Sequence, residues 1–141
     1  MERVQTVLAT HSSSIVHMGD AGAGQFAKLC NNALTISNLR NIVEVFSLAD
    51  RLGVSLSGLR EAFAHSSGGS FMLDAIGTKV TPHVAAHIAS LNRRDMEEFA
   101  SAMKRQGLDA TTILNWGLGG ADGLVSVVDR WSAPRFTGQV G

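Results

Sequence analysis

The fold is decided by residues 19–53, which read GDAGAGQFAKLCNNALTISNLRNIVEVFSLADRLG. A glycine-rich turn at 19–24 is followed by a helix-forming stretch, and Gly53 then offers a C-terminal stop. A helix of this length in a small domain is normally a central spine, so we expect shorter helices or a second subunit to cover it on more than one side. Its apolar residues keep helical spacing for about eight turns: Phe26, Leu29, Cys30, Ala33, Leu34, Ile42, Val45, Phe46, Ala49 and Leu52.

The segments that follow also favour helices. Ser55 fits the N-cap of a short helix, which is indicated by the spacing of Leu56, Leu59, Ala62 and Phe63. A small polar loop at 65–70 should end that helix, and residues 71–76 predict one or two further helical turns. Pro82 is expected to break the chain before the next apolar stretch.

Two more helices are predicted in the second half of the chain. Residues 95–106 have the pattern of an amphipathic helix that Gly107 ends, with Met96, Phe99 and Met103 facing inward. Residues 111–131 predict another helix. We expect a break or kink in it, because each glycine in a helix interior costs about 1 kcal/mol against alanine, and four glycines fall there: Gly117, Gly119, Gly120 and Gly123.

Residues 1–18 differ from the rest. A short helical stripe precedes residues 14–18, which predict a strand, yet no partner strand is indicated downstream. A strand without a sheet suggests the remnant of another domain. We therefore expect residues 1–18 to be such a remnant and residues 19–141 to form an all-α domain, a helical bundle around one long central helix.

Composition narrows the function classes. In 141 residues, twelve Lys and Arg offset twelve Asp and Glu, so no general field favours nucleic acid or a membrane surface as a partner. Apolar runs are too short to span a membrane, and no signal peptide is evident at the N-terminus. A single cysteine, Cys30, excludes an internal disulfide and fits a reducing cytosol, so we expect a soluble cytoplasmic protein with Cys30 in its core.

Residues 22–27 fit the G-x-G-x-x-A form of the dinucleotide-binding fingerprint. That fingerprint needs a second strand about 20 residues on, ending in an acidic residue that binds the ribose. Here Glu44 falls inside uninterrupted helical pattern instead. We therefore reject this interpretation of the glycines.

A wider pattern is more specific: Gly19-x-x-Gly22-x-Gly24-x-x-x-Lys28-x-x-Asn31-Asn32. It resembles the catalytic signature of the β-hydroxyacid dehydrogenase family, which includes 3-hydroxyisobutyrate dehydrogenase and 6-phosphogluconate dehydrogenase. The resemblance continues in order through most of the chain, with a polar loop followed by the aromatic Phe71, and with Arg94-Asp95 where the family usually has Lys-Asp. It implies a fold like the C-terminal domain of 6-phosphogluconate dehydrogenase, which follows a Rossmann domain.

The chemistry of Lys28 and Asn32 can be argued from their spacing. They are four residues apart on a helix, so their side chains stack on one face and can touch one small molecule. Lys28 lies within two turns of the helix start, where unpaired amides and the helix dipole favour an anion. Both features suit a hydroxy acid.

The resemblance implies the roles of the site residues. Lys28 would exchange the hydroxyl proton as hydride moves to the nicotinamide, and Asn32 would orient that oxygen or the carboxylate. Four residues would bind the substrate, a small hydroxy acid or semialdehyde: Gly22, Gly24, Asn31 and Ser70. Arg94 and Phe71 would contact the cofactor, NAD or NADP, which the preceding Rossmann domain would mainly bind, so the isolated chain should be inactive.

Other interpretations remain open. Lys28 and Arg94 also fit ordinary surface charges, and the helical domain could be a non-catalytic dimerisation or interaction module. His83 and His87 have metal-ligand spacing, but Val84 replaces the glutamate of a zincin motif and no third ligand is evident, so we expect no metal. The wide apolar surface of the long helix favours a homodimer.

Overall fold

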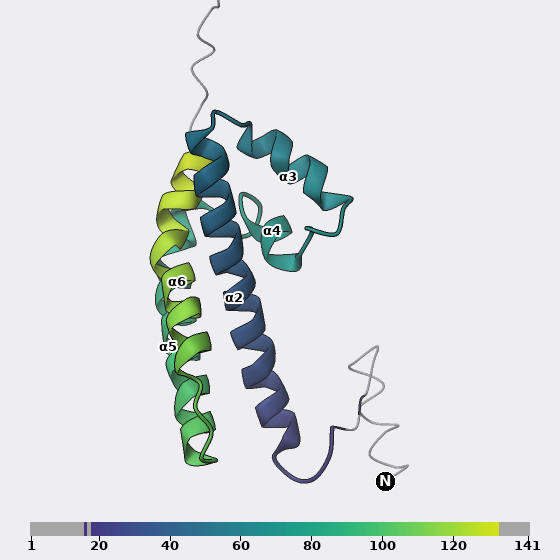
Figure 1. Cartoon of the computed structure of the whole chain (residues 1–141), viewed down its shortest axis with the longest axis vertical. Helices are drawn as coiled ribbons and strands as arrows, with labels where there is room; N and C mark the ends of the chain where they lie inside the picture. The colour runs from purple at the N-terminus through teal and green to yellow at the C-terminus, as the bar shows by residue number, and fades with distance from the viewer. Residues whose placement is uncertain (1–15, 17, 133–141) are drawn as a thin grey trace, which may run out of the picture.

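Five helices make up the part of the chain that the structure describes, residues 16 and 18–132 of a computed structural model. Three long helices lie side by side along the long axis, and two short ones lie beside the C-terminal half of the first (Figure 1). In chain order they are α2 (Ala23–Arg51), α3 (Leu56–Ala64), α4 (Phe71–Ala75), α5 (Pro82–Arg105) and α6 (Thr111–Ser132). The expected all-α bundle is confirmed, and β-structure within these residues is confined to one isolated bridge between Ile76 and Val80.

The long helix α2 is the central element, in contact with all four other helices. Gly22 caps its start with a φ of 98°, and Gly53 follows its end with a φ of 75°. Both angles lie in the left-handed region that a side chain disfavours, so glycine sets both ends of α2, as predicted. The predicted strand at 14–18 falls largely outside the described residues, and neither Val16 nor Met18 belongs to a strand.

The short helices begin where the sequence indicates. The Ser55 side chain accepts a hydrogen bond from the Gly58 amide at 3.1 Å and caps α3. Ser70 caps α4 in the same way, with its oxygen 3.2 Å from the Leu73 nitrogen. Each cap satisfies an amide that the first turn of a helix leaves unpaired.

The expected start of the next helix at Asp95 was wrong. Pro82 does not separate two segments but occupies the first turn of α5, which runs without interruption to Arg105. Proline suits this position because the first turn needs no amide donor and its fixed φ is already helical. The inward-facing residues were correct, since Met96 and Phe99 are buried and Met103 is partly buried.

The expected break in the last helix was also wrong, because α6 is continuous through its glycines. A Cβ atom at Gly120 would lie 2.8 Å from the backbone nitrogen of Arg40 on α2. At Gly117 it would lie 2.7 Å from the Met96 side chain on α5. The glycines therefore let α6 approach its neighbours closely, and this packing outweighs their low helix propensity.

In the contacts between α2 and α6, the residue numbers rise along both helices together. Asn41 pairs with Trp116, and further along Ser47 pairs with Arg130. These two helices therefore run parallel, whereas α5 runs antiparallel to α2, since Phe26 and Met103 pack into one cluster near the start of α2. The N-termini of α2 and α6 consequently lie at the same end of the bundle (Figure 1).

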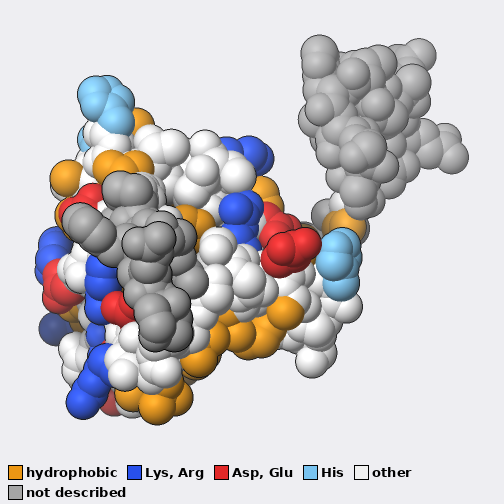
Figure 2. Space-filling model, turned by 90° about the horizontal axis from the view of Figure 1, so that it is seen from above, with side chains coloured by type: hydrophobic (Ala, Val, Ile, Leu, Met, Phe, Trp, Pro, Cys, Tyr) orange, Lys and Arg blue, Asp and Glu red, His pale blue; other side chains and the backbone are white. Residues whose placement is uncertain are grey.

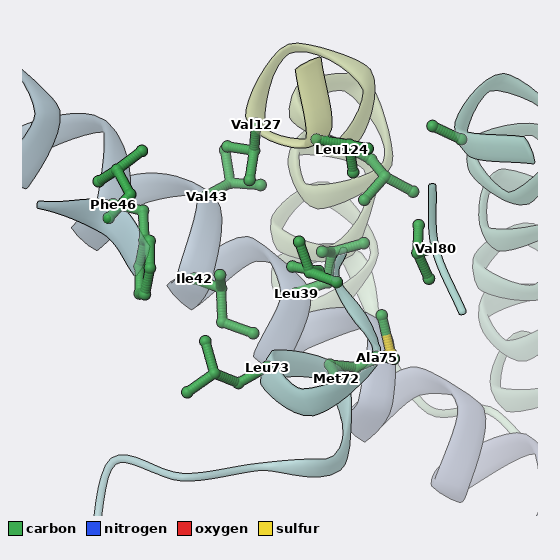
Figure 3. Close-up of a cluster of buried hydrophobic side chains, with 14 residues drawn as sticks. Leu39, Ile42, Val43, Phe46, Met72, Leu73, Ala75, Val80, Leu124 and Val127 are labelled. Carbon is green, nitrogen blue, oxygen red and sulfur yellow. The ribbon is translucent and has the colours of Figure 1, made fainter. Parts of the chain in front are cut away.

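The core forms two clusters along α2. The larger one surrounds the C-terminal half, where Phe46, Leu73 and Leu124 are almost fully buried (Figure 3). The smaller one lies at the N-terminal half, where Leu29 and Ala33 pack with residues of α5. Residues 18–132 contain no helix long and apolar enough to cross a membrane.

Cys30 is exposed, so its expected place in the core was wrong. It lies on the same face of α2 as several exposed apolar residues, and whole helical turns separate their positions. We call this set the α2 stripe: Cys30, Leu34, Val45, Leu48 and Leu52. The apolar pattern of α2 covers more of its circumference than the neighbouring helices can bury.

Candidate functional site

The predicted site residues of the long helix all fall in its N-terminal half. Gly22 is the N-cap of α2, and Gly24 lies in the first turn. A Cβ atom at either glycine would meet nothing within 4 Å, so no described residue requires glycine there by close approach. The positive φ of Gly22 accounts for that glycine, and Gly24 is left beside open space.

A polar hollow of about 430 Å³ lies against this half of α2. Its lining comes from α2, from the first residue of α4 and from the middle of α5: Asn31, Asn32, Thr35, Ile36, Phe71, Asn92 and Asp95. The structure thus brings together three of the predicted site residues, Asn31, Asn32 and Phe71. We refer to this feature as the polar hollow.

Asn32 is fixed by a contact between helices. Its Nδ2 donates a hydrogen bond to Oδ2 of Asp95 at 3.1 Å, and both side chains are partly buried. A hydrogen bond to a charged acceptor in such surroundings is stronger than one between neutral groups. This contact joins α2 to α5 beside the polar hollow.

Phe71 forms a wall of the polar hollow from the start of α4. The cap that Ser70 makes on that helix holds the backbone from which Phe71 projects, and the ring is 68% exposed. The Lys79 ammonium lies 5.1 Å from the ring centroid, a distance typical of cation–π contact. Ser70 therefore acts here through the helix cap, and it is not among the residues that line the polar hollow.

Lys28 and Arg94 lie outside the lining of the polar hollow. Lys28 is exposed one helical turn before Asn32, so its flexible side chain starts from the same face of α2. Arg94 is exposed on α5 beside Asp95 in the sequence.

Asn92 and Asp95 were not predicted as site residues. They are three residues apart on α5, so they share one face of that helix, adjacent to the buried Met96 and Phe99. The sequence indicated them only as two polar residues beside the buried apolar face of α5. Asp95 is partly buried and accepts the hydrogen bond from Asn32.

The histidines that the structure describes belong to no metal-binding group. His83 and His87 are both exposed near the start of α5. Within residues 18–132, no three His, Cys, Asp or Glu side chains gather as metal ligands do.

The sequence over residues 22–113 matches the model of a protein family described as NAD-binding of NADP-dependent 3-hydroxyisobutyrate dehydrogenase. The chain belongs to this family. The match spans α2 to the start of α6 and so includes every residue that lines the polar hollow. The resemblance to β-hydroxyacid dehydrogenases is thereby confirmed, and the cofactor that goes with the family is NAD or NADP, as expected.

Curated relatives agree with the family. The chain is 38% identical over 68 residues to a probable 3-hydroxyisobutyrate dehydrogenase of Mycobacterium tuberculosis, covering 48% of this chain and 23% of the relative. It is 34% identical over 74 residues to 2-(hydroxymethyl)glutarate dehydrogenase of Eubacterium barkeri, covering 52% and 25%. NAD-dependent L-serine dehydrogenase of Pseudomonas aeruginosa is 32% identical over 74 residues, with the same coverage.

The matched part thus spans about a quarter of the length of these relatives. No solved structure matches the chain at a significant level.

Proposed function

We propose that this helical domain forms the catalytic wall of an NAD(P)-dependent dehydrogenase that acts on a small β-hydroxyacid or the matching semialdehyde. One observation carries the proposal: the signature half of α2 borders a polar hollow, inside the region that matches the family. Asn31 and Asn32 line that hollow, and Lys28 starts one turn away on the same helix.

Each residue has a role in this reaction. Lys28 takes the hydroxyl proton of the alcohol during oxidation and returns it during reduction. A bound nicotinamide would supply the hydride chemistry. Asn32 holds the reacting oxygen, and the amides at the start of α2 near Gly22 favour the carboxylate. Phe71 offers a flat apolar face to the nicotinamide, and Arg94 binds an anionic group of the cofactor or substrate.

The dinucleotide needs a second domain. The described residues contain no parallel sheet, and the glycines at 22 and 24 begin a helix without a strand pair beside them. We propose that a Rossmann domain, of which residues 1–18 are the last part, binds most of the cofactor. The 141-residue chain alone should then neither oxidise hydroxy acids nor bind NAD or NADP with micromolar affinity, and calorimetry would measure this.

The decisive test of the chemistry is the replacement of Lys28 in an enzyme that joins this domain to a Rossmann domain of the family. Lys28→Ala should lower turnover by about 10² to 10⁴, the usual contribution of a positioned general acid or base, with little change in dinucleotide affinity. Lys104→Ala, another exposed lysine, is the matched control. Turnover of Lys28→Ala within about threefold of wild type, less than 1 kcal/mol, would make Lys28 an ordinary surface residue.

A second candidate function, self-association, is favoured by the α2 stripe. Leu34 is 65% exposed, Leu48 57% and Leu52 81%, which is unusual for leucines on one helix face. Hydrophobic side chains are also visible at the surface in Figure 2. We propose that the stripe pairs with a second copy of the chain to form a homodimer, either alongside catalysis or as the domain's only function.

A further inference from the structure

The contact between Asn32 and Asp95 decides which end of the asparagine amide a ligand meets. An ionised carboxylate only accepts hydrogen bonds, so the amide must turn its NH2 group toward Asp95, at 3.1 Å. The carbonyl oxygen Oδ1 of Asn32 then points away from Asp95. Among residues 18–132, no donor is hydrogen-bonded to that oxygen.

We propose that Asp95 is a positioning residue, which holds Asn32 as a fixed hydrogen-bond acceptor on the wall of the polar hollow and so selects a ligand with a hydroxyl donor. The inference rests on the proposed function and deepens it. An asparagine without such a partner can turn over and present either its NH2 group or its oxygen. With Asp95 in place, a ligand that lacks the hydroxyl leaves Oδ1 unpaired, and sites built this way discriminate strongly against it.

The charge of Asp95 also orients the ligand. Its carboxylate is the only charged group among the residues that line the polar hollow, so the carboxylate of a hydroxy acid is repelled from this wall. The start of α2, with its free amides and Lys28, favours that anion instead. The hydroxyl therefore lies at Asn32, and the carboxylate lies toward the N-terminus of α2.

The first test needs no activity and uses NMR of the side-chain amides in the 141-residue chain. Asp95→Asn removes the charge of the acceptor and should shift the Asn32 Nδ2 proton resonances, whereas Asp95→Glu keeps a carboxylate and should shift them less. Glu97→Gln removes the same charge at an exposed position of α5 and should leave the Asn32 resonances unchanged. Unchanged Asn32 resonances in Asp95→Asn would overturn the proposal.

The second test uses the enzyme that joins this domain to a Rossmann domain of the family, and compares two ligands that differ by one hydroxyl group, 3-hydroxyisobutyrate and isobutyrate. Both are added above about 1 mM, the upper end of usual Michaelis constants. The hydroxy acid should shift the Asn32 amide resonances of the wild type more than isobutyrate does, and the difference should vanish in Asp95→Asn.

The outcomes separate the two proposals. A hydroxyl-dependent shift that is as large in Asp95→Asn as in the wild type overturns the positioning role. If neither acid shifts Asn31, Asn32 or Thr35 in the joined enzyme, although Asp95→Asn still shifts the Asn32 resonances, the proposed function fails and the positioning role of Asp95 stands.

Discussion

The two halves of α2 differ in what they contact. Residues 23–36 border the polar hollow and pack into the smaller core cluster, whereas residues 37–51 pack into the larger cluster and against the glycines of α6. Because the helix is continuous, the second half can anchor the first. The comparison teaches that polar groups can be placed on the N-terminal half without a large loss of stability, since the stability of the domain comes mainly from the other half.

The largest expected effect is on the free energy of unfolding. It is tested by removing one core side chain from each half of α2. Phe46 is 2% exposed, stacked on Trp131 at 5.1 Å and edge-on to Phe63 at 6.2 Å. Phe46→Ala should lower the free energy of unfolding by about 3 to 5 kcal/mol. Phe26→Ala, at a partly buried position of the N-terminal half, should cost less than half as much. Urea unfolding measures both, and equal losses would contradict the division between the halves.

The next effect concerns the close approach of α6 to the C-terminal half. Alanine at Gly120 gains helix propensity of about 1 kcal/mol but places a Cβ atom 2.8 Å from the Arg40 nitrogen. The overpacking should dominate, so Gly120→Ala should destabilise the domain by about 1 to 3 kcal/mol. Gly24→Ala, a helical position with open space, should be neutral or stabilising. A Gly120→Ala domain as stable as the wild type in thermal unfolding would refute close packing as the reason for this glycine.

A third prediction concerns the α2 stripe, which runs along both halves. Leu48→Asp should weaken self-association by at least about tenfold, or 1.4 kcal/mol, while the monomer fold persists because Leu48 is 57% exposed. Analytical ultracentrifugation measures the association. Cys30 is the single cysteine of the chain, so its alkylation rate gives a second measure, which should fall as the protein concentration rises. A monomer at all concentrations would disprove the homodimer.

The smallest expected effect lies at the end of the bundle near the N-terminal half. Hydrogen bonds from the side chain and backbone of Thr111 lower the pKa of Asp109 below its ordinary value of 3.8, at the start of α6. A lowered folded-state pKa stabilises the fold above the unfolded pKa, and this contribution is lost as the pH falls through the folded pKa. Asp109→Asn should therefore lower the thermal midpoint slightly at neutral pH, and the difference should vanish once the pH falls below the lowered folded-state pKa of Asp109. A difference that persists in acid would show that charge is not the cause.

Local signals were enough to predict most of the fold. Gly22, Gly53 and Ser55 act on their own first or last turn, so their roles could be inferred from neighbouring residues. The cap that Ser70 makes on α4 was not predicted. The continuity of α6 could not, because it depends on Arg40 and Met96 from other helices. The exposure of Cys30 was missed for the same reason, since the pattern of α2 does not show which apolar positions find a partner.

The site was predictable along α2 and at Phe71, but not along α5. The order of Lys28, Asn31 and Asn32 follows from the signature, and helical spacing places them close together. Asp95 is 63 residues from Asn32 in the sequence, and their hydrogen bond depends on how α5 packs against α2. The neighbouring sequence does not indicate this contact beyond placing two polar residues, Asn92 and Asp95, next to the buried apolar face of α5.

The glycines of α6 also set the alignment of α2 along its own axis. Arg40 faces Gly119 and Gly120, and Val43 faces Gly123, so side chains of α2 sit in the notches that the missing side chains leave. A helix rises about 1.5 Å per residue and behaves as a rod over this length. A change in the depth or position of those notches would therefore move Asn32 relative to Asp95. The packing of Arg40 and Val43 against the glycines of α6 therefore sets the direction in which the Asn32 amide points.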